Sequence, residues 1–111
     1  FVSETVREKV LGLTHAEIPF SSAVVVDRFE EANEHGLMRF YCSILVERES
    51  QKPILIGRGG EMIKRIGTAA RHDLEAFFDA RVYLDLLVKV KSEWREDDRL
   101  LDELGMPRRQ R

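Results

Sequence analysis

The chain has 111 residues, the length of one domain, and its 43% of hydrophobic residues supply a single modest core. No apolar run approaches the ~20 residues of a membrane-spanning helix, and the lone Cys42 cannot form an internal disulfide. The composition therefore predicts a soluble protein of a reducing compartment and excludes the membrane, disulfide-scaffold and disordered classes. Because the chain starts at Phe1, without an initiator methionine or a basic leader, we expect a piece of a longer protein and no targeting peptide.

The charges are unevenly distributed along the chain, although the formal net charge is only −2. Residues 48–72 contain six basic and two acidic side chains, a net charge of +4, so the other residues together carry −6. A basic segment inside an acidic chain is typical of a local binding site for a polyanion. A solvated helix face has the same composition, so charge alone leaves both readings open.

The first half of the chain predicts a helix followed by a β-hairpin. Residues 2–13 place valine and leucine at helical spacing, which indicates an amphipathic helix. Residues 23–29 begin with β-branched side chains and read as a strand. The turn residues at 33–36 precede a second strand at 37–46 that is rich in aromatic and β-branched side chains.

The second half predicts a short helix, a glycine loop, a long helix, a strand and a last short helix. The apolar run at 53–56 stops at the glycines of 57–60, where a helix of about 18 residues begins and runs to Asp79. Residues 81–91 alternate apolar and polar side chains, which is the pattern of a half-buried strand. A short helix is expected at 97–104. Three strands and these helices predict an α+β fold with helices packed on one face of a sheet.

The sequence Gly57-Arg58-Gly59-Gly60 carries the most chemical information. Glycine lacks the Cβ that would keep another molecule away from the backbone. The helix that starts there adds N–H groups without intrahelical acceptors and the positive end of its dipole. This combination is suited to binding a phosphate.

Three phosphate-binding motifs contain glycines in such a pattern. A Walker A loop is excluded because Glu61, not lysine, follows Gly60, and a dinucleotide fingerprint is excluded because Met62 stands at its third glycine. The G-x-x-G loop of KH domains fits, with Ile56 and Ile63 expected to anchor the loop in the core. A plain turn between two helices, with purely structural glycines, is the alternative.

Other chemistry has little support in the sequence. His15, His35 and His72 lie in different elements without ligand spacing, so we expect neither a metal nor another cofactor. No serine has a neighbouring histidine–aspartate pair, so we expect no catalysis. Cys42 is expected to be a small buried residue. Trp94 could stack on a base, but tethering the last helix to the sheet is the preferred reading.

The loop and its flanks resemble the C-terminal KH domain of the Era family of bacterial GTPases. The likeness covers nearly the whole chain and is carried by residues 46–67, 82–95, 6–9, 17–19 and 101–105. The family commonly has lysine at the second loop position, where Arg58 keeps the charge. The chain lacks a Walker A motif, so we expect no GTP hydrolysis by this piece alone.

The resemblance implies a type II KH fold, αββααβ, with a three-stranded mixed sheet and an added short C-terminal helix. It places the KH domain at 1–105 and a basic, disordered tail at 106–111. It also implies binding of single-stranded RNA at the 3′ end of 16S ribosomal RNA during assembly of the small ribosomal subunit. The implied partners are that RNA, the small subunit and the GTPase domain of the parent chain, with a monomer as the default state. The family is cytoplasmic, and peripheral attachment to the inner membrane would come through the parent protein.

The expected RNA-binding residues combine the loop with the cations and aliphatic side chains around it. They are Arg48, Lys52, Ile56, Gly57, Arg58, Gly59, Gly60, Ile63, Lys64, Arg65 and Arg71. Loop amides and cations would hold phosphates, while a groove between the loop and a sheet edge would receive bases. A protein-interaction module with a purely structural glycine turn is the alternative function.

Overall fold

The computed structural model describes residues 1–14 and 22–91. These residues form helices and strands in the order helix, two strands, two helices, strand, joined in part by short 3-10 turns. The bounds are α1 Val2–Thr14, β1 Ala23–Glu30, β2 Leu37–Val46, η1 Glu49–Gln51, α2 Lys52–Ile56, η2 Arg58–Gly60, α3 Glu61–Phe78 and β3 Arg81–Val90. The order αββααβ confirms the predicted fold.

The three strands form one mixed sheet in the order β1-β2-β3. β1 pairs antiparallel with β2, with a register shift between Val26 and Arg28. β2 pairs in parallel with β3, from Leu37 opposite Arg81 to Val46 opposite Val90. Parallel strands need a long crossover, and the α2–α3 segment supplies it.

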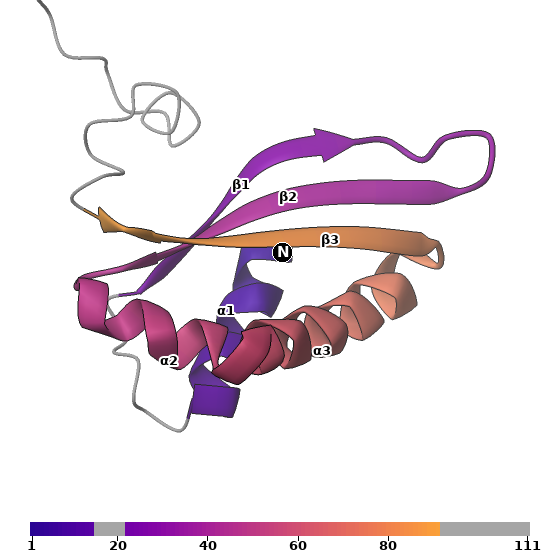
Figure 1. Ribbon diagram of the computed structural model, residues 1–111. Helices are drawn as coiled ribbons and strands as arrows, with labels where there is room; N and C mark the ends of the chain where they lie inside the picture. Colours follow the sequence, from indigo (N-terminus) through magenta and orange to yellow (C-terminus); the bar gives the residue numbers. More distant parts are fainter. Residues whose placement is uncertain (15–21, 92–111) are drawn as a thin grey trace, which may run out of the picture.

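All three helices lie on one face of the sheet (Figure 1). The strand alternation turns Ile44 and Val46 of β2 toward this face, where both are fully buried. Val6 and Val10 of α1 pack into the same cluster, together with further buried residues from α2, α3 and β3. The further residues are Leu55, Ile66, Ala70 and Val90.

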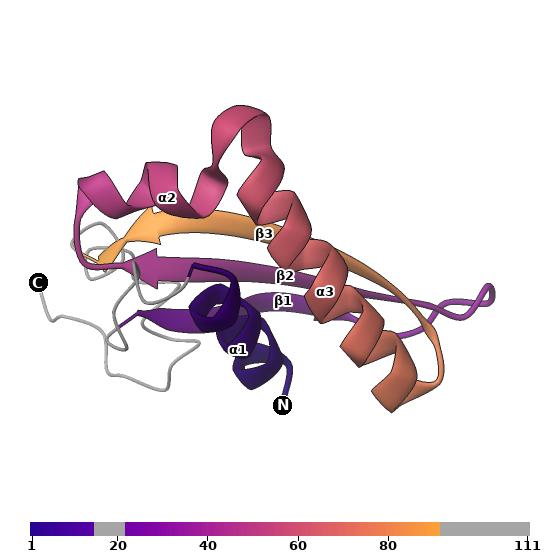
Figure 2. The same ribbon diagram turned by 90° about the horizontal axis from the view of Figure 1, so that it is seen from below.

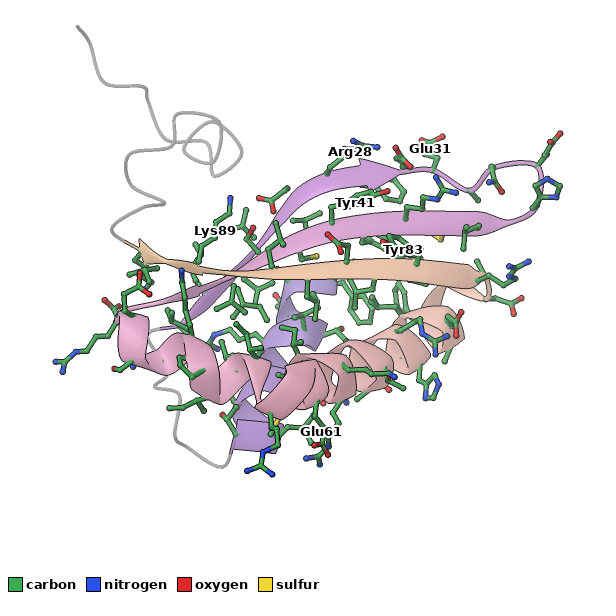
Figure 3. The ribbon with its side chains drawn as sticks, viewed as in Figure 1. Arg28, Glu31, Tyr41, Glu61, Tyr83 and Lys89 are labelled. Carbon is green, nitrogen blue, oxygen red and sulfur yellow. The ribbon has the colours of Figure 1, made fainter. Side chains whose placement is uncertain are left out.

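The other face of the sheet carries polar and aromatic side chains. Arg28, Tyr41, Tyr83 and Lys89 point away from the helices (Figure 3). The Arg28 guanidinium lies 4.7 Å from the centroid of the Tyr41 ring, and the rings of Tyr41 and Tyr83 are 5.8 Å apart. Leu87, the apolar exception in the alternation of β3, is on this polar side and 51% exposed.

The predicted turns form as the sequence indicates. In the hairpin loop the Asn33 Oδ1 accepts the N–H groups of His35 and Leu37, at 2.9 and 3.2 Å, and Gly36 has a φ of 74°. Asp79 ends α3 in the left-handed conformation, with a φ of 50°. The predicted helix at 97–104, the tail at 106–111, Trp94 and His15 lie outside the described residues.

Within the described ranges, no helix is long and apolar enough to cross a membrane. The same residues contain no group of three or more histidine, cysteine or acidic side chains that could hold a metal ion.

Cys42 should be chemically inert in the folded protein. The side chain is buried beside Phe40 and Leu74, as predicted, and burial raises the pKa of its thiol to about 12. Only about one molecule in ten thousand would carry the reactive thiolate at pH 8. We expect iodoacetamide labelling, followed by mass spectrometry, to be at least about a hundredfold slower in buffer than in denaturing urea. Equal rates under the two conditions would contradict this placement.

Candidate nucleic-acid interface

The glycine loop bends the chain between α2 and α3 by using backbone conformations that favour glycine (Figure 2). The φ angles of Gly57, Gly59 and Gly60 are 76°, 61° and 80°. Arg58, the only loop residue with a side chain, is the only one of the four without a positive φ. The sequence Gly-Arg-Gly-Gly therefore matches the conformational demand of each position.

The three glycines differ in what surrounds them. A Cβ added to Gly57 would lie 2.7 Å from the backbone nitrogen of Met62 and 2.8 Å from its Cβ, so no side chain fits there. A Cβ on Gly59 or Gly60 would have no neighbour within 4 Å. Gly57 is thus required by the packing of the loop itself, whereas the other two border open space that another molecule could enter.

Two of the four loop amides are engaged inside the loop. The N–H of Gly57 donates to the Pro53 carbonyl at 2.8 Å, and the N–H of Gly60 donates to the Gly57 carbonyl at 3.2 Å. Among the residues that the structure describes, the N–H groups of Arg58 and Gly59 have no acceptor. Those two amides are available to an external hydrogen-bond acceptor.

The predicted anchoring of the loop by Ile56 is wrong. Leu55 is fully buried in the core, while Ile56 is 40% exposed. In the five-residue helix α2, Leu55 and the partly buried Ile54 occupy the side that packs on the core, which leaves Ile56 on the side turned outward. On the other side of the loop, Ile63 packs against the core as predicted, beside Met62.

Three open hollows follow one another from α2, past the glycine loop, to the outer side of α3. One of about 710 Å³ lies along α2 and includes Lys52, Ile56 and Arg58. A second, of about 220 Å³, lies at the start of α3 and shares Gly57 and Arg58 with the first. A third, of about 470 Å³, shares Arg65 with the second and continues along the outer side of α3.

Among the charged side chains that line these hollows, lysine and arginine outnumber glutamate by two to one in each hollow. Arg58, Lys64 and Arg65 line them and belong to no ion pair among the described residues. Lys52 lies 3.7 Å from the Glu49 carboxylate, which also lines the hollow along α2. The excess of basic side chains and the free loop amides are the two features that an anion-binding site needs.

Two of the predicted RNA-binding residues, Arg48 and Arg71, line none of these hollows. Arg71 lies about 16 Å along the helix axis from Gly60, and its guanidinium binds Glu75 at 3.2 Å. Arg48 precedes η1 on the far side of α2, where its N–H donates to the Gln51 side chain at 3.0 Å.

Sequence reasoning missed several residues that line the hollows. Glu49 and Glu61 place carboxylates among the cations, and Glu61 lines two of the hollows. Met62 is the residue that contacts Gly57. Its place two residues after the loop is a signal that the sequence offers, because a tight loop brings its first residue close to the residues that follow it. Leu13 comes from α1 and lines the hollow on the outer side of α3, which no local pattern could reveal.

Comparison with known proteins assigns the family. The model of the KH domain family matches residues 17–95. The chain belongs to the KH domain family. This match agrees with the fold, with the glycine loop between the two crossover helices and with the predicted resemblance to the C-terminal part of the Era proteins.

Proteins named GTPase Era are similar in sequence to this KH domain. GTPase Era of Syntrophus aciditrophicus is 53% identical over 103 residues, which cover 93% of this chain and 34% of that protein. GTPase Era of Neisseria meningitidis is 52% identical over 103 residues, covering 93% and 33%. The chain thus spans about a third of the length of these relatives.

Two solved structures have the same fold as this KH domain. One is Aquifex aeolicus Era bound to GDP and AlF4−, and the other is Era in complex with MgGDPNP and nucleotides 1506–1542 of 16S ribosomal RNA. Each has a TM-score of 0.77 and 37% identity, and each comparison covers 94% of this chain and 35% of the solved chain.

An alanine at Gly57, the first residue of the loop, should destabilise the KH domain more than an alanine at Gly59, the third residue of the loop. Gly57→Ala would force Met62 away and impose a positive φ on alanine, so we expect a loss of about 2–4 kcal/mol. Gly59→Ala meets open space and adds only the cost of the positive φ, about 1 kcal/mol. Urea denaturation followed by circular dichroism measures both values. Equal losses would mean that the Gly57–Met62 contact does not constrain the loop.

Proposed function

We propose that this KH domain binds single-stranded RNA through its glycine loop, and that the RNA is the 3′ end of 16S ribosomal RNA. The observation that carries the proposal is the pair of free amides at Arg58 and Gly59, bordered by open space and by cations. Its biological target is supported by the relative whose structure holds nucleotides 1506–1542 of 16S ribosomal RNA.

The loop would hold the RNA backbone. Phosphate oxygens would accept the N–H groups of Arg58 and Gly59, and Gly59 and Gly60 would let the sugar-phosphate chain approach closely because they carry no Cβ. The side chains of Arg58 and Arg65 would neutralise the phosphates. Lys52 and Lys64 would extend the positive surface to either side. Arg48 and Arg71 would add only longer-range attraction, because the structure puts them away from the loop.

The bases would lie on the side of the loop that faces the sheet edge. Among the residues that the structure describes, only β2 lies beside β3, which is therefore the edge strand next to α2 (Figure 2). An edge strand offers N–H and C=O groups that can read base edges. The half-exposed Ile56, together with Ile63 at the start of α3, would supply the aliphatic surface against which bases pack.

The wider role follows from the relatives. Proteins named GTPase Era are about three times as long as this chain, so their GTP hydrolysis would reside outside the part that this KH domain spans. Within such a protein, the KH domain would deliver the GTPase to the small ribosomal subunit during assembly. The chain itself would act as the RNA-binding part, and not as a catalyst, in the cytoplasm or at the inner membrane through the parent protein.

A carboxylate placed in the loop should weaken RNA binding. Gly59→Asp puts a negative charge where a phosphate would lie, and aspartate is among the residues that best tolerate the left-handed conformation found there. We expect affinity for a short RNA copying the 3′ end of 16S ribosomal RNA to fall by at least about tenfold. Fluorescence anisotropy with this RNA and with a scrambled RNA measures the change.

Gly59→Asn is the matched control, because asparagine has the same shape and backbone preference without the charge. It should keep more of the affinity than Gly59→Asp. Equal binding by the aspartate variant and the parent would show that the loop does not hold phosphate. No binding of either RNA by the parent would leave the protein-interaction alternative as the better reading.

The dependence of RNA affinity on salt concentration should show how many phosphates the cations of the loop neutralise. If about three phosphates are neutralised, affinity falls about twentyfold between 50 and 200 mM salt. Arg58→Gln should reduce the slope of log affinity against log salt by about 0.7. Arg81→Gln removes the same charge at the opposite end of α3 and should leave the slope unchanged. If the two variants have the same slope, the charge of Arg58 contacts no phosphate.

A further inference from the structure

The hollow on the outer side of α3 combines an apolar floor with polar walls. It has a volume of about 470 Å³ and is lined by Leu13 of α1 and by residues of α3 from Glu61 to His72. Leu13 and Ala69 form the apolar part, and Leu13 also packs against the core. The floor of the hollow is therefore a fixed part of the fold.

The polar side chains of the hollow follow one side of α3 away from the glycine loop. Arg65, Thr68 and His72 are spaced by three and four residues, so they are neighbours on the helix surface. All three are exposed. Among the residues that the structure describes, His72 has no hydrogen-bond or ion-pair partner. Together with Lys64, the row offers positive charge, a hydroxyl group and an imidazole ring to a molecule in the hollow.

This hollow is continuous with the one at the glycine loop. Glu61 and Arg65 line both. The Lys9–Asp73 ion pair, at 2.7 Å, joins α1 to α3 one residue after His72 and fixes the spacing of the two helices there. A chain-like ligand that is held at the loop can thus continue along α3 without crossing a negatively charged surface.

A nucleotide has the chemistry that this hollow fits. Its phosphate is attracted by Lys64 and Arg65, and the flat face of its base packs on aliphatic groups or on an imidazole ring. Hydroxyl and carboxylate groups such as those of Thr68 and Glu61 can bond to the edges of a base. No single ligand group would use all of these features, whereas one nucleotide does.

We propose that the hollow on the outer side of α3 is a second nucleotide subsite, which binds the continuation of the RNA strand that the glycine loop holds. The proposal rests on the proposed function of the loop and adds a place where the strand is bound away from it. The base would pack against Leu13, Ala69 and His72, and the phosphates would lie toward Lys64 and Arg65.

The distance between the two sites sets the length of RNA that reaches both. A G-x-x-G loop clamps about four nucleotides. Thr68, in the middle of the row, lies about 12 Å along the helix axis from Gly60. A stacked strand advances about 3.4 Å per nucleotide, so about four further nucleotides reach the hollow. An RNA of about four nucleotides therefore occupies the loop alone, whereas one of about twelve, extended at both ends, occupies the hollow as well.

His72→Ala tests the subsite without altering the loop. Its affinity for an RNA of about twelve nucleotides that copies the 3′ end of 16S ribosomal RNA should fall at least about fivefold, which is the loss of one stacked base. Its affinity for the central four nucleotides alone should equal that of the parent. Fluorescence anisotropy measures both affinities. His35→Ala, which removes an exposed histidine from the hairpin loop, is the matched control and should bind both RNAs as the parent does.

Gly59→Asp separates this proposal from the proposed function, because it should weaken the binding of both RNAs. If His72→Ala binds the longer RNA as tightly as the parent, the subsite is wrong and the assignment of the loop stands. An equal loss with both RNA lengths would also overturn the subsite, since His72 would then act on the loop. Failure of the parent to bind either RNA would overturn the loop assignment and the subsite together.

Amide NMR signals provide a second readout that needs no substitution. The short RNA should shift the signals of residues 57–60 and leave those of residues 68–72 in place. The longer RNA should shift both groups. If it shifts no signal between residues 68 and 72, the strand leaves the loop in another direction and the subsite is refuted.

Discussion

Gly57 lies so close to Met62 that no side chain fits between the two residues, and the short loop between α2 and α3 depends on this contact. Gly57 has a positive φ, and the two later glycines complete the bend of the chain within four residues. Both α2 and α3 pack on the same face of the sheet (Figure 1). The free amides of Arg58 and Gly59 exist only because the loop closes in this way.

The loop depends in turn on the core beneath it. Leu55 fills the core immediately before the loop, and Ile66 of α3 fills it shortly afterwards. Both contact the cluster that β2 and α1 build from valine and isoleucine. Burial of these side chains stabilises the ends of the loop by the hydrophobic effect, which leaves the four loop residues free of any packing role except that of Gly57. A backbone held this firmly at both ends is preorganised for a ligand.

α3 links the two ends of the molecule. Its 18 residues extend about 27 Å, with the hollows beside the glycine loop at its first turns and the stacked rings of Phe1 and Phe77 at its last turn. The Lys9–Asp73 ion pair and the buried side chains of α1 hold the helix against the rest of the fold. The hollows and the stacked rings are therefore separate surfaces of one rigid helix.

The sequence predicted helices and strands correctly where the pattern of a few neighbouring residues is enough. It failed where one had to decide which side chain of a short helix faces the core. The alternation of β3 and the spacing of apolar residues in α3 gave elements that match the structure closely. Ile56 was expected in the core because it is apolar and adjoins the loop. In a five-residue helix, however, periodicity is too short to tell which of Leu55 and Ile56 faces inward. The fit of α2 against the sheet decides that choice.

The amino-acid sequence by itself determined the order of the elements, the left-handed turn at the glycines and the concentration of positive charge around it. Each of these properties depends on residues that are neighbours in the chain. The tertiary structure alone decided that β3 lies beside β2 and that Leu13 of α1 lines a hollow along α3. It also decided that Phe1 stacks on Phe77, from the far end of another helix. Such contacts join residues far apart in the chain, and they arise only when all the apolar faces are buried together in one core.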